Sequence, residues 1–142
     1  MSGQHDEMDE IVRQWIEKAE HDYSAAIRLL SSDDPETPFD VICFHAQQCA
    51  EKYLKALCVF RRQTVPRSHD LLELLPILPE AIRLTLSSDE IAELNPFAVE
   101  ARYPGFSENV ARNDAGRAVD ICGKIRSACS KYLGINRKAG RK

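Results

Sequence analysis

The sequence predicts an all-α protein, an antiparallel up-and-down helical bundle of three long helices with short helices between the second and the third. Apolar residues recur at steps of three and four along residues 8–31, 39–61 and 107–133, as on one face of a helix. Nothing in the chain has the strict alternation of a strand, and Pro and Gly gather between the periodic stretches. The 142 residues fit one domain, 1–142, with an ordered core of about 8–133 and a basic tail of 134–142.

The first helix, at 8–31, carries one charged residue on its apolar stripe. The stripe holds Ile11, Trp15, Ala19, Asp22, Ala26 and Leu30. A carboxylate among apolar groups needs a partner or stays protonated, and we expect Asp22 to pair with Lys52, Arg102 or the hydroxyl of Tyr103. Such a group either fixes helix packing as a structural polar residue or lines a polar cleft. Pro35 and Pro38 stop the pattern.

The second helix, at 39–61, has a broad apolar face and no Gly or Pro, which makes it the most secure element. Off the centre of that face lie Gln47, Gln48, Glu51, Lys52 and Lys55. The last helix, at 107–133, shows the same periodicity, and Gly134 is placed to end it as a C-cap.

The segment "RRQTVPRSHD" joins the second helix to the short ones. Pro66 disfavours helix at the residue before it, and Ser68 stands where an N-cap is expected, with His69 and Asp70 opening the next helix. That helix is short because Pro76 and Pro79 follow. A further turn is expected after Ser87 or Ser88, and a Pro-Gly turn at 104–105 precedes the last helix.

Charge and cysteine content exclude several classes of protein. The net charge is −3, and without the four cations of the tail "RKAGRK" the body stands at 15 minus 22, or −7, unlike a nonspecific nucleic-acid coat. No apolar run approaches the ~20 residues of a membrane span, and the polar N-terminus is not a secretory signal. Five cysteines without a CxxC pair are expected to be reduced core residues of a cytoplasmic protein, with no metal site and no cofactor.

Four stretches together resemble the HEPN domain family (higher eukaryotes and prokaryotes nucleotide-binding). They are "WIEKAEHDYSAA", "FHAQQCAEKYLKALCV", "PRSHDLLELL" and "VEARYPG", in the family's order and followed by the long last helix. The resemblance implies an up-and-down helical bundle that usually forms a homodimer. It also implies three roles known in the family: ribonuclease toxin, nucleotide binding, and partnership with a small nucleotidyltransferase in a two-component, toxin–antitoxin-like system.

Arg62 and His69 match the arginine–histidine spacing of the family's ribonucleases, with six residues between them. A neutral histidine could take the proton of an RNA 2′-hydroxyl, and an arginine could hold the phosphorane charge, so no metal would be needed. However, the segment holds three arginines, so such a spacing also arises by chance. In the structural alternative, His69 fixes the loop and Ser68 caps the helix.

The main expectation is therefore a nucleotide-binding or accessory protein that is not itself an enzyme and partners a small nucleotidyltransferase. A metal-independent endoribonuclease and a structural oligomerisation module without ligand are the alternatives. The expected ligand-binding residues, for a nucleotide or RNA, are Lys52, Lys55, Arg67, Asp70, Arg102 and Tyr103. Arginine beside tyrosine suits contact with a phosphate and stacking on a base, although lysines on helices are more often solvated.

Overall fold

A computed structural model describes residues 2–99, 103–105 and 109–135 of the chain, and every regular element within these residues is helical, as predicted. The long helices are α1 (Ser2–Leu30), α2 (Phe39–Phe60) and α5 (Arg112–Leu133). Between α2 and α5 lie the 3₁₀-helices η1 (Leu71–Glu73), η2 (Leu75–Ile77) and η3 (Asn95–Ala98) and the short helices α3 (Glu80–Arg83) and α4 (Ser88–Leu94).

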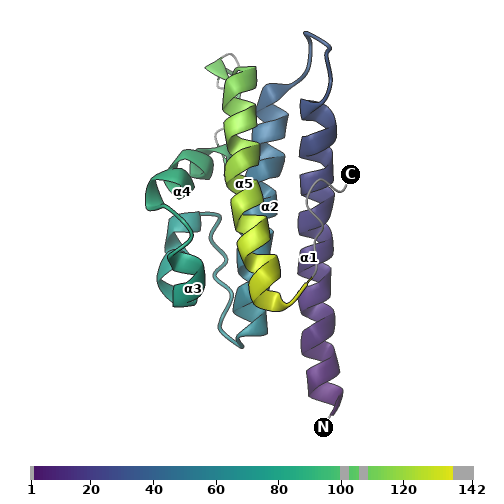
Figure 1. The fold of residues 1–142 in the computed structure, drawn as a ribbon, viewed down its shortest axis with the longest axis vertical. Coiled ribbons are helices and arrows are strands. Elements are labelled where there is room, and N and C mark those ends of the chain that lie inside the picture. The colour runs from purple at the N-terminus through teal and green to yellow at the C-terminus, as the bar shows by residue number, and fades with distance from the viewer. Residues whose placement is uncertain (1, 100–102, 106–108, 136–142) are drawn as a thin grey trace.

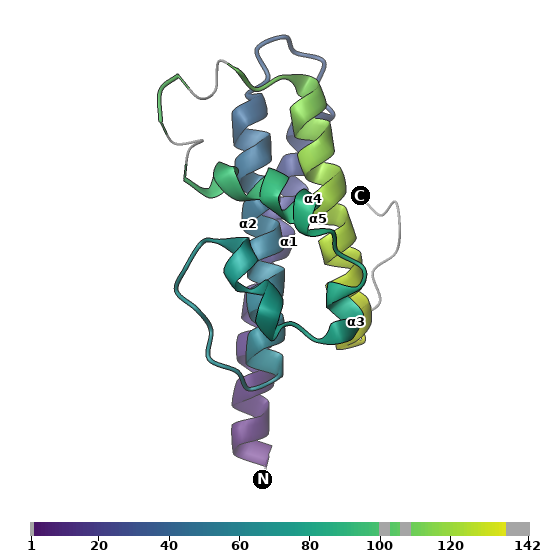
Figure 2. The ribbon, with the colours of Figure 1, turned by 90° about the vertical axis from the view of Figure 1, so that its left-hand side faces the viewer.

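The long helices form a bundle in which α2 packs against both α1 and α5 (Figure 1). In that view α1 runs upward and α2 and α5 run downward, so α1 is antiparallel to both. The segment with α3 and α4 leads the chain back to the start of α5, and Figure 2 shows it covering the side of the bundle away from α1. Because α2 and α5 run in the same direction, this segment makes the connection that a fourth long helix would otherwise make.

The core is centred on α2, whose residues are buried for most of its length. Its largest fully buried side chains are Ile42, Tyr53, Leu54 and Leu57. Burying a side chain of this size stabilises the fold by about 1.5–3 kcal/mol relative to leaving it in water. The apolar face predicted from the sequence is thus the face that holds the bundle together.

Two of the long helices end in the same motif but with different residues. At the end of α5, Gly134 has φ 77°, and the Ile135 N–H donates to the carbonyl of Ser130 over 2.8 Å, so the predicted Gly134 C-cap is confirmed. At the end of α2, the Gln63 N–H donates to the carbonyl of Cys58 over 2.8 Å, and the left-handed residue is Arg62, with φ 60°. A non-glycine residue in this conformation costs roughly 1–2 kcal/mol.

Three predicted helix starts differ from those observed. The first long helix begins at Ser2 instead of residue 8, and the last begins at Arg112 instead of residue 107. The predicted Ser68 cap is wrong by two residues: Asp70 is the N-cap, and its carboxylate accepts from the Leu72 N–H. Ser68 Oγ instead accepts from the Asp70 N–H over 2.9 Å, which shapes the approach to η1.

All five cysteines, Cys43, Cys49, Cys58, Cys122 and Cys129, are buried free thiols, as expected for core residues. Burial raises the pKa of the Cys43 thiol to about 12. The described part of the chain contains no cluster of His, Cys, Asp and Glu that could hold a metal ion. None of its helices is both long enough and apolar enough to cross a membrane.

Candidate functional site

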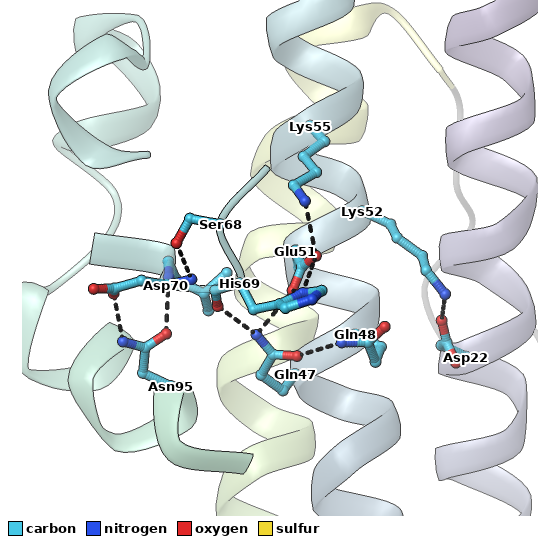
Figure 3. Close-up of polar contacts among 11 residues, drawn as sticks. Asp22, Gln47, Gln48, Glu51, Lys52, Lys55, Ser68, His69, Asp70 and Asn95 are labelled. Carbon is cyan, nitrogen blue, oxygen red and sulfur yellow. Dashed lines mark hydrogen bonds and ion pairs between the residues drawn. The ribbon is translucent and has the colours of Figure 1, made fainter. Parts of the chain in front are cut away.

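A buried carboxylate on α2, Glu51, joins a lysine and a histidine (Figure 3). Lys55 Nζ lies 3.0 Å from Glu51 Oε2, and both side chains are almost fully buried. His69 Nδ1 lies 3.0 Å from Glu51 Oε2 and 3.2 Å from Oε1, although His69 is 18 residues further along the chain. The His69 side chain is 52% exposed, so about half of its surface is open to solvent although Nδ1 faces Glu51.

Two glutamines extend this polar cluster along α2. Gln47 Nε2 lies 3.3 Å from Glu51 Oε1 and also 3.3 Å from the carbonyl oxygen of His69. Gln48 Nε2 donates to Gln47 Oε1 over 2.8 Å. The amide of Gln47 therefore holds both the carboxylate and the backbone of the histidine, which fixes the loop against α2.

The loop around His69 is held on its other side by a pair between Asp70 and Asn95 (Figure 3). Asn95 Nδ2 donates to Asp70 Oδ1 over 2.6 Å, and Asn95 Oδ1 accepts from the Leu71 N–H over 2.8 Å. These contacts join the start of η1 to the start of η3. They leave Asp70 Oδ2 without a hydrogen bond to the described residues.

An open hollow of about 530 Å³ lies between η1 and η3, next to this loop. Ser68, His69 and Asp70 contribute to its polar part, and Leu72 and Val99 are among its apolar residues. Both apolar residues are exposed, at 39% and 46%. The site therefore combines an exposed imidazole, a carboxylate and an apolar wall.

The structure does not bring Arg62 to His69 within one chain. The α-helix rises about 1.5 Å per residue, so the C-cap Arg61 lies about 15 Å along α2 from Glu51, which contacts His69. The guanidinium of Arg61 itself donates to the carbonyl oxygen of Ile77 over 2.8 Å. Arg67, two residues before His69, is exposed and is the arginine nearest to it in sequence.

Among the described residues, Asp22 contacts Lys52, one of its expected partners. Its Oδ2 lies 2.6 Å from Lys52 Nζ, and its Oδ1 lies 2.8 Å from Nδ1 of His45, a partner that the sequence did not predict. Tyr103 is 61% exposed. Arg102 lies outside the described residues. The polar contacts of Asp22 link α1 to α2, in keeping with the structural alternative for this residue.

The two lysines expected to bind phosphate are thus each paired with a carboxylate. Lys52 contacts Asp22, and the ammonium of Lys55 contacts Glu51 while lying 5.9 Å from the centre of the Trp15 ring. Each ammonium group is thus neutralised by a neighbouring carboxylate. The two lysines are therefore better suited to positioning Asp22 and Glu51 than to binding the phosphate of a ligand.

A separate polar cluster joins all three long helices. Arg126 on α5 donates to Glu20 on α1 through Nε over 2.7 Å and through Nη2 over 3.0 Å, and Tyr53 on α2 donates to the same carboxylate. The guanidinium also lies 4.1 Å from the centre of the Tyr23 ring. The hydrogen bonds with Glu20 raise the pKa of Arg126, so this charge is permanent and the cluster is structural.

Glu51, Gln47 and Asn95 were not among the predicted site residues. Gln47, Glu51 and Lys55 are spaced four residues apart, so they form one row along α2, and this spacing was a readable signal. The sequence placed this row off the centre of the apolar face and singled out only Lys55 in it as a site residue, whereas the loop of His69 contacts both Gln47 and Glu51. Asn95 had no signal in the sequence, because its partner Asp70 lies 25 residues away.

Comparison with known proteins agrees with the fold. The model of a family described as the HEPN domain matches residues 12–132. The crystal structure of TT1696 from Thermus thermophilus is 28% identical, with a TM-score of 0.70, covering 84% of this chain and 96% of that one. The structure of ST0689, described as an archaeal HEPN homologue, is 26% identical, with a TM-score of 0.68, covering 86% and 97%. No curated protein matches the chain significantly.

Proposed function

Because the chain belongs to the HEPN domain family, we propose that it binds a nucleotide beside His69 and acts as the accessory partner of a small nucleotidyltransferase. In this role the protein supplies a binding site and performs no chemical step itself.

The observation that carries the proposal is the exposed imidazole of His69 anchored on the buried pair Glu51–Lys55. Removing two charges from water costs several kcal/mol per ion, and a buried pair regains this only with additional hydrogen bonds. Such a cluster adds little net stability compared with apolar packing of the same volume. The cluster instead holds His69 in one orientation beside an open hollow, and a binding site requires side chains that are held in this way.

The chemistry of the hollow suits a nucleoside better than a bare anion. Leu72 and Val99 offer apolar surface for a base, while Ser68 and Asp70 offer a hydroxyl and a carboxylate oxygen for polar edges. We propose that Arg67, which is exposed in the same loop, contacts the phosphate. In this proposal the nucleoside occupies the hollow and the phosphate extends toward an arginine outside it.

The partner is proposed to be a second polypeptide that carries nucleotidyltransferase activity, and the accessory protein is proposed to form a homodimer. The homodimer proposal draws on exposed aromatic residues: Phe60 at the end of α2 is 44% exposed and stacks edge-to-face on Tyr132 of α5, itself 37% exposed. Exposed apolar residues of this kind favour association. Light scattering of the purified protein tests the dimer, and pull-down with a small nucleotidyltransferase tests the partner.

Binding is tested by titrating the protein with ATP, AMP and GTP while following its melting temperature. A ligand at 100 times its Kd adds about 2.7 kcal/mol to the free energy of unfolding. We expect His69→Ala to weaken binding about tenfold, since roughly one hydrogen bond is lost. His21→Ala, an exposed histidine on α1, is the matched control and should bind as wild type does. If no nucleotide raises the melting temperature, the proposal fails.

Cleavage of RNA without metal is the second candidate, and the backbone of Arg62 favours it. Its φ of 60° is a conformation that glycine adopts easily and arginine does not, and such conformations gather at functional sites. Since Arg62 and His69 are far apart in one chain, this activity requires a dimer in which Arg62 of one chain lies beside His69 of the other. RNA degraded in the presence of EDTA by wild type but not by His69→Ala would replace the binding role with this one.

A further inference from the structure

We infer that Glu51 is a positioning residue that fixes the tautomer of His69 and thereby determines which group of the ligand meets the imidazole. This inference rests on the proposed function, because it names the chemical class of contact made at the same site.

The position of the proton on His69 follows from the groups that surround Glu51. Glu51 Oε2 accepts from the ammonium of Lys55 over 3.0 Å, and Gln47 Nε2 faces Oε1 at 3.3 Å, so the carboxylate is surrounded by donors and is ionised. An ionised carboxylate is an acceptor only. His69 Nδ1, at 3.0 and 3.2 Å from its two oxygens, must therefore carry a proton.

A neutral imidazole with its proton on Nδ1 has a lone pair on Nε2. That nitrogen lies on the ring edge away from Glu51, and the side chain is half exposed, so the lone pair is available to a ligand. A lone pair attracts a hydroxyl or an amino group and repels the oxygens of a phosphate. While the imidazole is neutral, the ligand class at His69 is thus a hydrogen-bond donor, such as a ribose hydroxyl or a base amino group.

A second histidine in the same chain provides an internal control. His45 Nδ1 lies 2.8 Å from Asp22, and this carboxylate also accepts from Lys52 over 2.6 Å. The same reasoning assigns the proton of His45 to Nδ1. The two carboxylates lie on different helices, so each can be changed without altering the other histidine's partner.

Long-range ¹H–¹⁵N spectra of the histidine rings at about pH 9, where imidazoles are neutral, read the tautomers directly. We expect Nδ1–H for His69 and His45 in wild type. Glu51→Gln, whose amide can donate, should move the proton of His69 to Nε2 and leave His45 unchanged, and Asp22→Asn should do the reverse. If neutral His69 in the wild-type protein carries its proton on Nε2, the inference is overturned. This measurement does not depend on whether any variant folds.

The ligand class is tested on the wild-type protein in the same spectra. ATP should shift the Nε2 signal of His69, and inorganic triphosphate should not. An equal shift with inorganic triphosphate would show a phosphate contact and overturn the assignment of a donor. If ATP does not bind at all, the proposed function fails, while the tautomer spectra still decide the role of Glu51.

Discussion

The carboxylate of Asp22 on α1 accepts a hydrogen bond from Nζ of Lys52 on α2 over 2.6 Å. The pair is mostly buried, and His45 completes it from about two turns earlier on α2. The contact joins two antiparallel helices by polar groups at the edge of their packed apolar faces.

Removing this carboxylate should destabilise the protein. Asp22→Ala leaves the ammonium of Lys52 without its partner in a half-buried place, and we expect a loss of roughly 2–3 kcal/mol, as for hydrogen bonds to charged groups. Urea unfolding at pH 7 measures it. Glu17→Ala, at an exposed position of the same helix, should stay within about 0.5 kcal/mol of wild type. Equal losses for both variants would contradict a specific role for Asp22.

Glycine at position 62 should stabilise the protein. The left-handed backbone costs an arginine roughly 1 kcal/mol more than a glycine, part of which is returned by the greater freedom of glycine in the unfolded chain. We expect Arg62→Gly to raise the free energy of unfolding by about 0.5–1 kcal/mol. Arg61→Gly is the matched control and should lower it, since the Arg61 guanidinium holds Ile77 and its φ is −90°. A lower free energy of unfolding for Arg62→Gly would show that the left-handed backbone conformation of Arg62 does not destabilise the protein.

The contact between Glu90 on α4 and Lys124 on α5 should make stability depend on pH. The hydrogen bond from Lys124, over 2.6 Å, lowers the pKa of Glu90 below its usual value of 4.5. A carboxyl whose pKa is lower in the folded state stabilises the fold fully above its unfolded pKa and loses this effect as the pH falls through the folded pKa.

A double-mutant cycle measures this contact with the variants Glu90→Gln, Lys124→Met and their combination. The coupling free energy between the two side chains should stabilise the protein at pH 7. The coupling should shrink progressively below about pH 4.5. Urea unfolding between pH 3 and pH 7 measures it. A coupling that is unchanged or larger at pH 3 would have the wrong sign for this contact.

The buried thiols should resist alkylation while the protein is folded. Burial raises the pKa of Cys43, Cys58 and Cys129, and the thiolate is the reactive form. We expect iodoacetamide at pH 8 to modify these positions only after urea unfolding, as mass spectrometry of the peptides can show. Rapid modification of Cys43 in the native protein would mean that α2 opens locally.

The helices were predictable from the sequence because their apolar period extends over many turns. The start of α5 was less predictable because its N-cap is Ala111, which has no capping side chain, and the start of η1 was less predictable because two polar residues compete for the cap. Ser68 and Asp70 both have suitable side chains, and the contact with Asn95 favours Asp70.

The site was harder to predict, because its contacts join distant residues. Lys52 could be named as a partner of Asp22, since an isolated carboxylate on an apolar stripe demands a cation. His45 could not, because its position depends on how α1 and α2 are rotated. The burial of Glu51 could not be predicted, because the loop that covers it contains His69, which is 18 residues further along the chain. No local sequence pattern indicates that this loop packs on α2.

The most direct test of the central claim is to locate ATP on the isotopically labelled protein by amide chemical shifts. The account predicts that saturating ATP shifts the signals of Ser68, His69, Asp70 and Asn95, and leaves those of Asp22 and of Lys124 unchanged. Shifts confined to another face of the bundle, or no shifts at millimolar ATP, would contradict a nucleotide site beside His69.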